Sequence, residues 1–151
     1  MKIPFNELQI KRLGTGDTVL AQQLFRLMNA VFNEAGPQMP SELYLETLLT
    51  NPVFYCYIAI YQGKVTGGLT AYELPMYNAE RSEIFIYDIA IKPEYQRRGF
   101  GSVLVQSLIA HGEATGKTIF VNADKADQHA LDFYRSLNGE AAKVVQFTFG
   151  V

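Results

Sequence analysis

Apolar residues recur along this chain with two different periods, and stretches of the two kinds alternate. Alternating or continuous runs of β-branched and aromatic residues predict strands, whereas apolar residues three or four positions apart predict helices. The resulting order is β-α-α-β-β-β-α-β-α-β. The expected strands are 8–13, 54–61, 65–74, 82–91, 118–123 and 144–149, and the expected helices are 17–34, 41–49, 102–114 and 126–137.

Alternation of this kind predicts an α/β (α+β) fold with a central sheet flanked by about four helices. With 151 residues and 48% hydrophobic content, we expect a single domain over 1–151 that needs no metal or disulfide to fold. The glycine and proline residues in segment 36–40 separate the first two helices. We expect this segment to form a lip beside a substrate.

The most informative loop follows the strand at 82–91 and has the sequence Gln96-Arg97-Arg98-Gly99-Phe100-Gly101. Its two glycines allow a tight turn and a close approach of the backbone to a ligand. Free N–H groups at the start of the next helix, together with the helix dipole, favour an anion there. Arg97 and Arg98 add two positive charges. An ordinary strand-to-helix turn is the alternative, and the context has to decide between them.

Net charge and the distribution of apolar segments indicate which classes of partner the protein is not expected to bind. A net charge of −2 and a pI of about 5.7 give no overall attraction to nucleic acid or to anionic membranes. Segment 1–7 lacks the apolar run of a signal peptide, and no stretch approaches the ~20 apolar residues of a membrane span. We therefore expect a cytoplasmic protein with no nucleic-acid or membrane partner.

Cysteine and histidine content argues against metal or thiol chemistry. The single cysteine, Cys56, lies in an apolar run and is expected to be a buried thiol. The only histidines, His111 and His129, have no Cys or His neighbour at zinc-ligand spacing, so we expect surface roles for both and no metal site.

In its context of element order, the glycine loop resembles the Q/R-x-x-G-x-G/A loop of the GNAT acyl-CoA-dependent N-acetyltransferases. The resemblance implies the GNAT fold, whose mixed, mostly antiparallel central sheet contains splayed strands, and acetyl-CoA as co-substrate. In that family the loop and the following helix hold the coenzyme pyrophosphate through backbone amides. The matching coenzyme-binding positions in this chain are Gln96, Arg97, Arg98, Gly99, Phe100, Gly101 and Ser102.

The strand before the loop extends the resemblance. In GNAT enzymes this strand splays from its neighbour and binds the pantetheine arm like an added peptide strand. By distance from the loop, this role falls on Ile89, Ala90 and Ile91, with the Ile89 amide facing the thioester oxygen as it becomes negative.

The helix near the C-terminus also resembles the family. Segment 127–134 matches the pattern N-x-x-A-x-x-x-Y, although Asp127 stands where asparagine is usual. Tyr134 then falls on the tyrosine that protonates the departing thiolate, a task that suits a neutral phenol. The alternative for Tyr134 is a core aromatic residue at helical spacing.

Segments 71–75, 81–91, 121–124 and 145–147 resemble more closely the aminoglycoside 3-N-acetyltransferases of the gentamicin-modifying type. This resemblance implies transfer of acetyl to the 3-amino group of a 2-deoxystreptamine ring, antibiotic resistance, and a homodimer. Two alternatives stay open: the same chemistry on a polyamine, a peptide amine or a small metabolite, and a coenzyme A-binding module without catalysis.

Amine attack on a thioester requires a neutral amine, so a carboxylate has to take its proton directly or through water. Asp88 lies next to the expected thioester position in an apolar run, where an unpartnered charge is costly. We expect Asp88 to anchor the amine or act as base, a structural salt bridge being the alternative; a bulge near it would re-aim the strand faces. Expected contacts to a polycationic acceptor are Glu83, Asp124 and Glu34, and further acids that could line the same wall are Glu42, Glu46 and Glu73.

Overall fold

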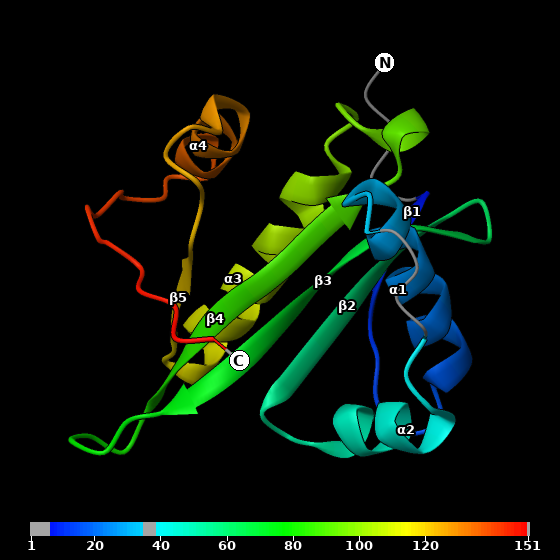
Figure 1. The fold of residues 1–151 in the computed structure, drawn as a ribbon, viewed down its shortest axis with the longest axis horizontal. Coiled ribbons are helices and arrows are strands. Elements are labelled where there is room, and N and C mark those ends of the chain that lie inside the picture. The colour runs from blue at the N-terminus through cyan, green and yellow to red at the C-terminus, as the bar shows by residue number, and fades with distance from the viewer. Residues whose placement is uncertain (1–6, 35–38, 151) are drawn as a thin grey trace.

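The computed structural model describes residues 7–34 and 39–150, and its strands form one open sheet in the order β1-β2-β3-β4-β5 (Figure 1). Neighbouring strands are antiparallel from β1 to β4, whereas β4 and β5 are parallel. The predicted mixed, mostly antiparallel sheet is therefore confirmed. The strands are β1 (Leu8–Arg12), β2 (Phe54–Tyr61), β3 (Lys64–Pro75), β4 (Ser82–Ile91) and β5 (Thr118–Val121).

Helices cover both faces of the sheet. Figure 1 shows α1 and α2 over one face and α3 over the other, with α4 near the end of β4. Each face has its own apolar cluster, because strand residues alternate between the two faces. The helices are α1 (Thr18–Val31), α2 (Glu42–Thr50), α3 (Phe100–Thr115) and α4 (Gln128–Ser136), and a short 3-10 helix, η1 (Pro93–Tyr95), precedes α3.

Gly68 in β3 allows α1 to lie close to the sheet. A Cβ at this position would come within 2.5 Å of the Leu24 side chain and of the Tyr57 carbonyl oxygen. Leu24 is fully buried in this contact. The close approach places the end of α1, at Val31, near the end of β4.

A bulge in β4 changes which residues face each layer. Asp88 lies opposite Thr70 of β3, but the next pair joins Ile86 to Ala71, so Tyr87 has no partner. Ile86 packs in the apolar cluster under α3, whereas Asp88, two positions later, lines a cavity with residues of α1. Tyr87 lines the same cavity. The expected bulge near Asp88 is confirmed, and it brings two consecutive side chains to one face.

The sixth strand expected at 144–149 is not formed, which corrects the sequence prediction. Residues 139–150 have no regular secondary structure. An apolar alternation produces a strand only where a neighbouring strand edge accepts its backbone hydrogen bonds. In the described part of the chain no strand pairs with this segment. Its large apolar side chains are consequently exposed: Val144, Val145, Phe147 and Phe149.

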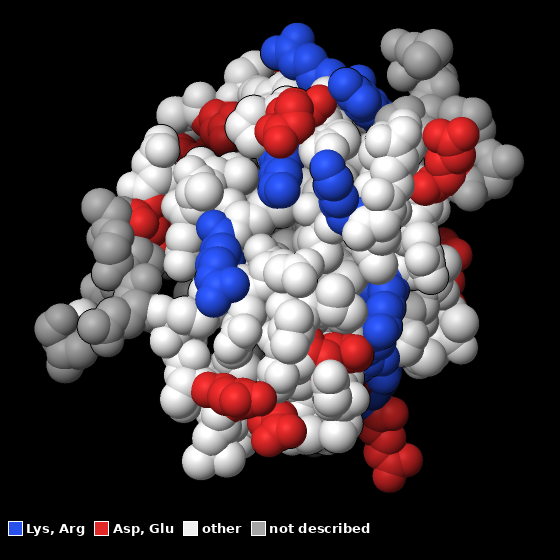
Figure 2. Space-filling view, turned by 90° about the vertical axis from the view of Figure 1, so that its right-hand side faces the viewer, with Lys and Arg blue, Asp and Glu red and all other residues white. Residues whose placement is uncertain are grey.

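Two other expectations concern the surface and the chain ends. None of the helices within 7–34 and 39–150 is long and apolar enough to cross a membrane. Figure 2, which views the molecule from the right-hand side of Figure 1, shows basic and acidic side chains intermixed on that face. Residues 1–6 and 35–38 lie outside the described residues, so the structure describes only residues 39 and 40 of the expected lip at 36–40.

Candidate functional site

A cavity of about 330 Å³, which we call the loop cavity, lies between the end of β4, the start of α3 and one side of α4. Every residue that was expected to bind the coenzyme lines this cavity, except Arg98. The guanidinium carbon of Arg98 instead lies over the Tyr95 ring, 5.6 Å from its centroid. The lining residues are Val31, Ile89, Ala90, Ile91, Tyr95, Gln96, Arg97, Gly99, Phe100, Gly101, Ser102, His129, Ala130, Phe133 and Tyr134.

Backbone N–H groups at the start of α3 are available to a ligand in the loop cavity. Gly99 is the N-cap of α3 and adopts a left-handed conformation, with φ of 86°. The helix begins at Phe100, two residues earlier than expected from the sequence. The Val103 N–H donates to the Gly99 carbonyl oxygen at 3.1 Å, and no side chain caps the helix. The three preceding N–H groups, from Phe100 to Ser102, therefore point out of the helix as an anion site.

The loop itself is tightly built. Arg97 also has a positive φ, 62°, which is uncommon for a residue with a side chain. The Gln96 Nε2 donates to the Ile91 carbonyl oxygen at 2.9 Å and so ties the loop to the strand. At Gly101 a Cβ would lie 3.4 Å from the Phe133 ring, so any larger side chain there would crowd the gap between the loop and α4.

The end of β4 has one open edge. Its ladder with β5 covers only the segment from Glu83 to Ile86. On the other side, the Lys92 N–H donates to the Thr66 carbonyl oxygen of β3 at 2.9 Å. Backbone groups alternate in direction along a strand, so the N–H groups of Ile91 and Ile89 point toward the open side. The predicted splay of the two strands thus leaves an edge that an extended, amide-containing ligand could pair with.

Tyr134 reaches the loop cavity from α4. Burial, and then the charge of Asp127, raise the pKa of the Tyr134 phenol above its usual value. The phenol therefore stays protonated near neutral pH and can donate a proton. Asp127 has a structural task of its own, because its Oδ1 accepts a hydrogen bond from the Ala130 N–H at 3.0 Å and caps α4.

Asp88 lies in a second cavity of about 300 Å³, which we call the acid cavity, on the α1 side of β4. Glu34 lines the same cavity. Burial, and then the charge of Glu34, raise the pKa of the Asp88 carboxyl. Asp88 makes neither an ion pair nor a side-chain hydrogen bond with any residue in 7–34 or 39–150. No described residue therefore neutralises its charge.

Aromatic side chains form much of the wall around Asp88, and the sequence analysis missed them. Tyr72 and Tyr87 meet edge to face, with ring centroids 5.7 Å apart. The sequence does show that Tyr87 is next to Asp88 in one strand. Consecutive strand residues face opposite sides of a sheet unless a bulge intervenes, so this pair alone did not predict an aromatic wall around Asp88. The cavity is completed mainly by apolar residues of α1, α2 and β2, with Met39 and Pro40 from the expected lip.

Consecutive residues of β4 line the two cavities. Asp88 lines the acid cavity, and Ile89, the next residue, lines the loop cavity. A group bound along the open edge of β4 would therefore end beside the carboxylate.

Two expected substrate contacts lie in neither cavity. Glu83 is half-buried toward the other end of β4, opposite Thr118 of β5. Asp124 is exposed, and its Oδ1 accepts a hydrogen bond from the Ala126 N–H at 2.8 Å within its own turn. The further acids Glu42 and Glu46 are exposed on α2 and also line neither cavity.

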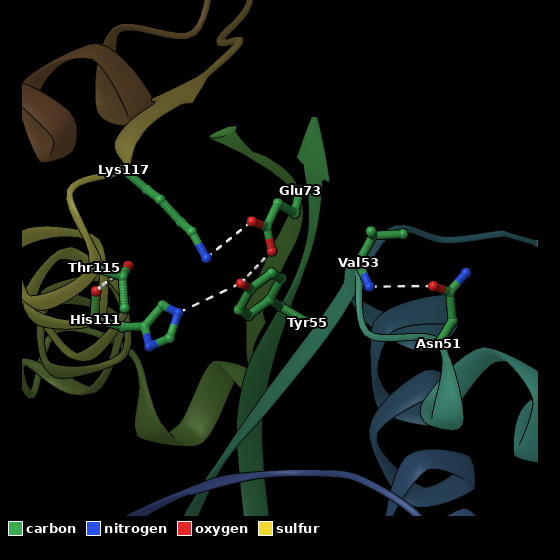
Figure 3. Close-up of polar contacts among 7 residues, drawn as sticks. All are labelled: Asn51, Val53, Tyr55, Glu73, His111, Thr115 and Lys117. Carbon is green, nitrogen blue, oxygen red and sulfur yellow. Dashed lines mark hydrogen bonds and ion pairs between the residues drawn. The ribbon is translucent and has the colours of Figure 1, made fainter. Parts of the chain in front are cut away.

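Glu73 lies on the opposite face of the sheet and is already paired (Figure 3). Lys117 Nζ is 2.8 Å from its Oε1, and the Tyr55 hydroxyl donates to its Oε2 at 2.7 Å. Burial opposes ionisation of Glu73, but hydrogen bonds from Lys117, Tyr55 and Ser82 outweigh it, so the pKa of the Glu73 carboxyl is lowered. Glu73 is thus part of a structural network and not of the acid wall.

The remaining reactive groups take ordinary places. Cys56 is buried, as expected, and burial raises the pKa of its thiol to about 12, which leaves it unreactive. The sequence suggested a surface role for His111, but the residue is half-buried, and its Nε2 lies 3.4 Å from the Tyr55 hydroxyl. His129 is exposed at the loop cavity. Within the described ranges, no group of three or more His, Cys, Asp or Glu side chains is placed to hold a metal ion.

Comparison with known proteins agrees with this geometry. Residues 21–139 match the acetyltransferase (GNAT) family. An aminoglycoside acetyltransferase from an uncultured soil metagenomic sample, solved with sisomicin, is 36% identical, with a TM-score of 0.92 over 97% of this chain and 97% of that one. Its complex with trehalose gives 37% identity and a TM-score of 0.93 over 97% and 98% of the two chains.

A second aminoglycoside acetyltransferase from such a sample is 33% identical, with a TM-score of 0.89 over 95% of this chain and 98% of that one. AAC(6')-Iy, solved with the bisubstrate analogue CoA-S-monomethyl-acetylneamine, is 17% identical with a TM-score of 0.78 over 95% and 98% of the chains, which is a likeness of fold. A comparison with curated proteins gave no match.

Proposed function

The chain belongs to the GNAT family of acetyltransferases, which use acetyl-CoA, and on this premise we propose that it transfers acetyl to an amine of an aminoglycoside. The observation that carries the proposal is the Asp88 carboxylate, which has no partner among the described residues and lies in an aromatic cavity, one residue from the strand edge that faces the loop cavity. The 33–37% identity to aminoglycoside acetyltransferases over nearly the whole chain supports the choice of acceptor.

The loop cavity is the proposed site of acetyl-CoA. The N–H groups of Phe100, Gly101 and Ser102 would hold the pyrophosphate at the positive end of α3. The open edge of β4 would pair with the amides of the pantetheine arm, which places the thioester near Ile89 and therefore near Asp88.

The reaction is a direct transfer in a ternary complex. The acceptor nitrogen attacks the thioester carbonyl carbon, and its proton passes to Asp88 directly or through water. The Ile89 N–H would stabilise the oxygen that becomes negative. When the carbon–sulfur bond breaks, the thiolate takes the proton of the Tyr134 phenol, which burial keeps protonated.

The acid cavity fits a polycationic sugar. Glu34 and Asp88 supply two negative charges, and the faces of Tyr72 and Tyr87 supply apolar surface for cationic groups and ring carbons. Within this proposal the acetylated group is the 3-amino group of 2-deoxystreptamine. Acetylation would remove a positive charge from the drug and cause resistance in the cytoplasm.

The test is a thiol-release assay with acetyl-CoA against a panel of aminoglycosides and polyamines, with the product position read by NMR. We expect turnover with 2-deoxystreptamine compounds and acetylation at the 3-amino group. Turnover of polyamines alone would establish the other acceptor class. Binding of acetyl-CoA with no turnover of any amine would indicate a non-catalytic binding module.

A further inference from the structure

β3 contains two buried threonines whose hydroxyl groups have different surroundings. Thr66 is fully buried, and its Oγ1 donates to the Ala59 carbonyl oxygen at 3.1 Å. Thr70 is 7% exposed, and its hydroxyl makes no hydrogen bond with a described residue. Among the buried and half-buried residues described, every fully covered side-chain N or O atom has a hydrogen-bond partner. The Thr70 hydroxyl is therefore not fully covered, and it is open to the acid cavity that Thr70 lines.

The pairing of β3 with β4 fixes Thr70 directly opposite Asp88. Opposite residues of an antiparallel pair project from the same face, with Cβ atoms roughly 4.5–5.5 Å apart. Both side chains line the acid cavity, and they make no direct hydrogen bond with each other. Two hydrogen bonds of about 2.8 Å each, joined at one water molecule, span a gap of this size.

The acid cavity has both the room and the chemistry for such a water molecule. Its volume of about 300 Å³ is far above the roughly 30 Å³ that one water molecule occupies. The charged side chains on its wall are those of Asp88 and Glu34, and no described lysine or arginine lines it. Its neutral polar side chains are Asn29, Thr70, Tyr72 and Tyr87. Of these, Thr70 is the one that the strand pairing places opposite Asp88.

We propose that Thr70 is a positioning residue for the acetyl transfer: its hydroxyl and the Asp88 carboxylate hold the water molecule through which the acceptor amine loses its proton. This inference rests on the proposed function and selects the route through water over direct transfer to Asp88. The water donates one hydrogen to an Asp88 oxygen and the other to the Thr70 Oγ1, so a lone pair faces the acceptor ammonium. The ammonium gives a proton to this water while the water gives one to Asp88, which leaves a neutral amine, a water molecule and a carboxylic acid.

Steady-state kinetics of two Thr70 variants tests the proposal. Thr70→Val keeps the shape of the side chain but lacks the hydroxyl, so kcat should fall by about 10- to 100-fold at neutral pH. Thr70→Ser keeps the hydroxyl and should stay within about threefold of the wild type. The loss in Thr70→Val should shrink as the pH rises, because an acceptor amine that is already neutral needs no proton acceptor. The KM for acetyl-CoA should be unchanged in both variants.

The matched control is Thr66→Val, which removes the hydroxyl that is hydrogen-bonded to Ala59. It should lower the melting temperature and leave kcat unchanged, because a buried carbonyl oxygen loses its partner. Thr70→Val should melt like the wild type, because its hydroxyl has no described partner to lose. An unchanged kcat in Thr70→Val, or an equal loss in Thr70→Val and Thr70→Ser at every pH, would refute the positioning role.

A measurement without substrate separates this inference from the proposed function. The hydroxyl and its water stabilise the charged carboxylate, so the pKa of Asp88, read by NMR titration of the carboxyl carbon, should be higher in Thr70→Val than in the wild type or Thr70→Ser. Glu34, Tyr72 and Tyr87 line the cavity in all three proteins, so the difference reports on Thr70. Equal Asp88 pKa values in Thr70→Val and the wild type would overturn the water bridge even if aminoglycosides are acetylated. A higher value in Thr70→Val without turnover of any amine would support the bridge and refute the proposed function instead.

Discussion

Glu73 and Asp88 are carboxylates on adjacent strands, both half-buried, yet the protein treats them in opposite ways. Glu73, on the α3 face, has Lys117 and Tyr55 as partners, and the pKa of its carboxyl is lowered. Asp88, on the α1 face, has no partner of opposite charge among the described residues, and burial raises its pKa. The like charge of Glu34 raises it further.

The difference separates a structural acid from a functional one. A carboxylate whose charge is met within the fold adds stability and has little left to offer a ligand. A carboxylate that is desolvated next to another acid is destabilising alone, and it is relieved by a cation or by a proton. We therefore assign the chemistry to Asp88 and a stabilising role to Glu73.

Replacing Asp88 should produce the largest effect on turnover. Asp88→Asn keeps the shape of the side chain but removes the proton acceptor, so kcat should fall by about 100- to 10,000-fold. The affinity for acetyl-CoA, measured by calorimetry, should stay near normal because the loop cavity is untouched. The control is Asp124→Asn, an exposed acid outside both cavities, which should leave kcat unchanged. Equal turnover for Asp88→Asn and the wild type would end the assignment.

Replacing Glu73 should reverse the pattern, with a loss of stability and little loss of activity. Glu73→Gln removes a charged hydrogen-bond acceptor, so the free energy of unfolding should fall by about 1–3 kcal/mol in urea titrations. The kcat should stay within about twofold of the wild type. In a double-mutant cycle with Lys117→Gln, a coupling energy near zero would show that the pair does not stabilise the fold.

Both acids illustrate what the sequence could and could not predict. The glycine loop, the strand end at 89–91 and Tyr134 were predictable because each belongs to a local pattern. Asp88 was predictable as a charge inside an apolar run. The side of the sheet that Glu73 occupies was not, because it depends on strand register and on a partner, Lys117, that lies far along the chain.

Segment 144–149 shows the same limit for the fold. Its alternation correctly describes a strand-forming sequence, but whether the strand forms depends on which edge is free to pair with it. Pairing partners are a property of the assembled sheet and not of the segment.

Replacing Glu34 should have a smaller effect than replacing Asp88 or Glu73. It is exposed, so solvent screens its attraction for a cationic acceptor. Glu34→Gln should raise the KM for the acceptor by about three- to tenfold at low salt and by less at high salt, with little change in kcat. Steady-state kinetics at two ionic strengths measures this. A large fall in kcat with no salt dependence would instead place Glu34 in the proton transfer.

The smallest effect should be a difference in how the two acids contribute to stability as the pH changes. The carboxyl of Glu73 has a folded-state pKa below its ordinary value of 4.5, so its stabilisation is present above that value and is lost as the pH falls through the folded-state pKa. Asp88 has a folded-state pKa above its ordinary value of 3.8, so its contribution is present at low pH and is lost as the pH rises through the raised pKa.

Thermal melts from acid to neutral pH should therefore show Glu73→Gln converging with the wild type on acidification. Asp88→Asn should become the more stable protein relative to the wild type as the pH rises toward 7. If Asp88→Asn instead lost stability relative to the wild type toward neutral pH, the Asp88 carboxylate would have a stabilising partner, and the contrast with Glu73 would be wrong.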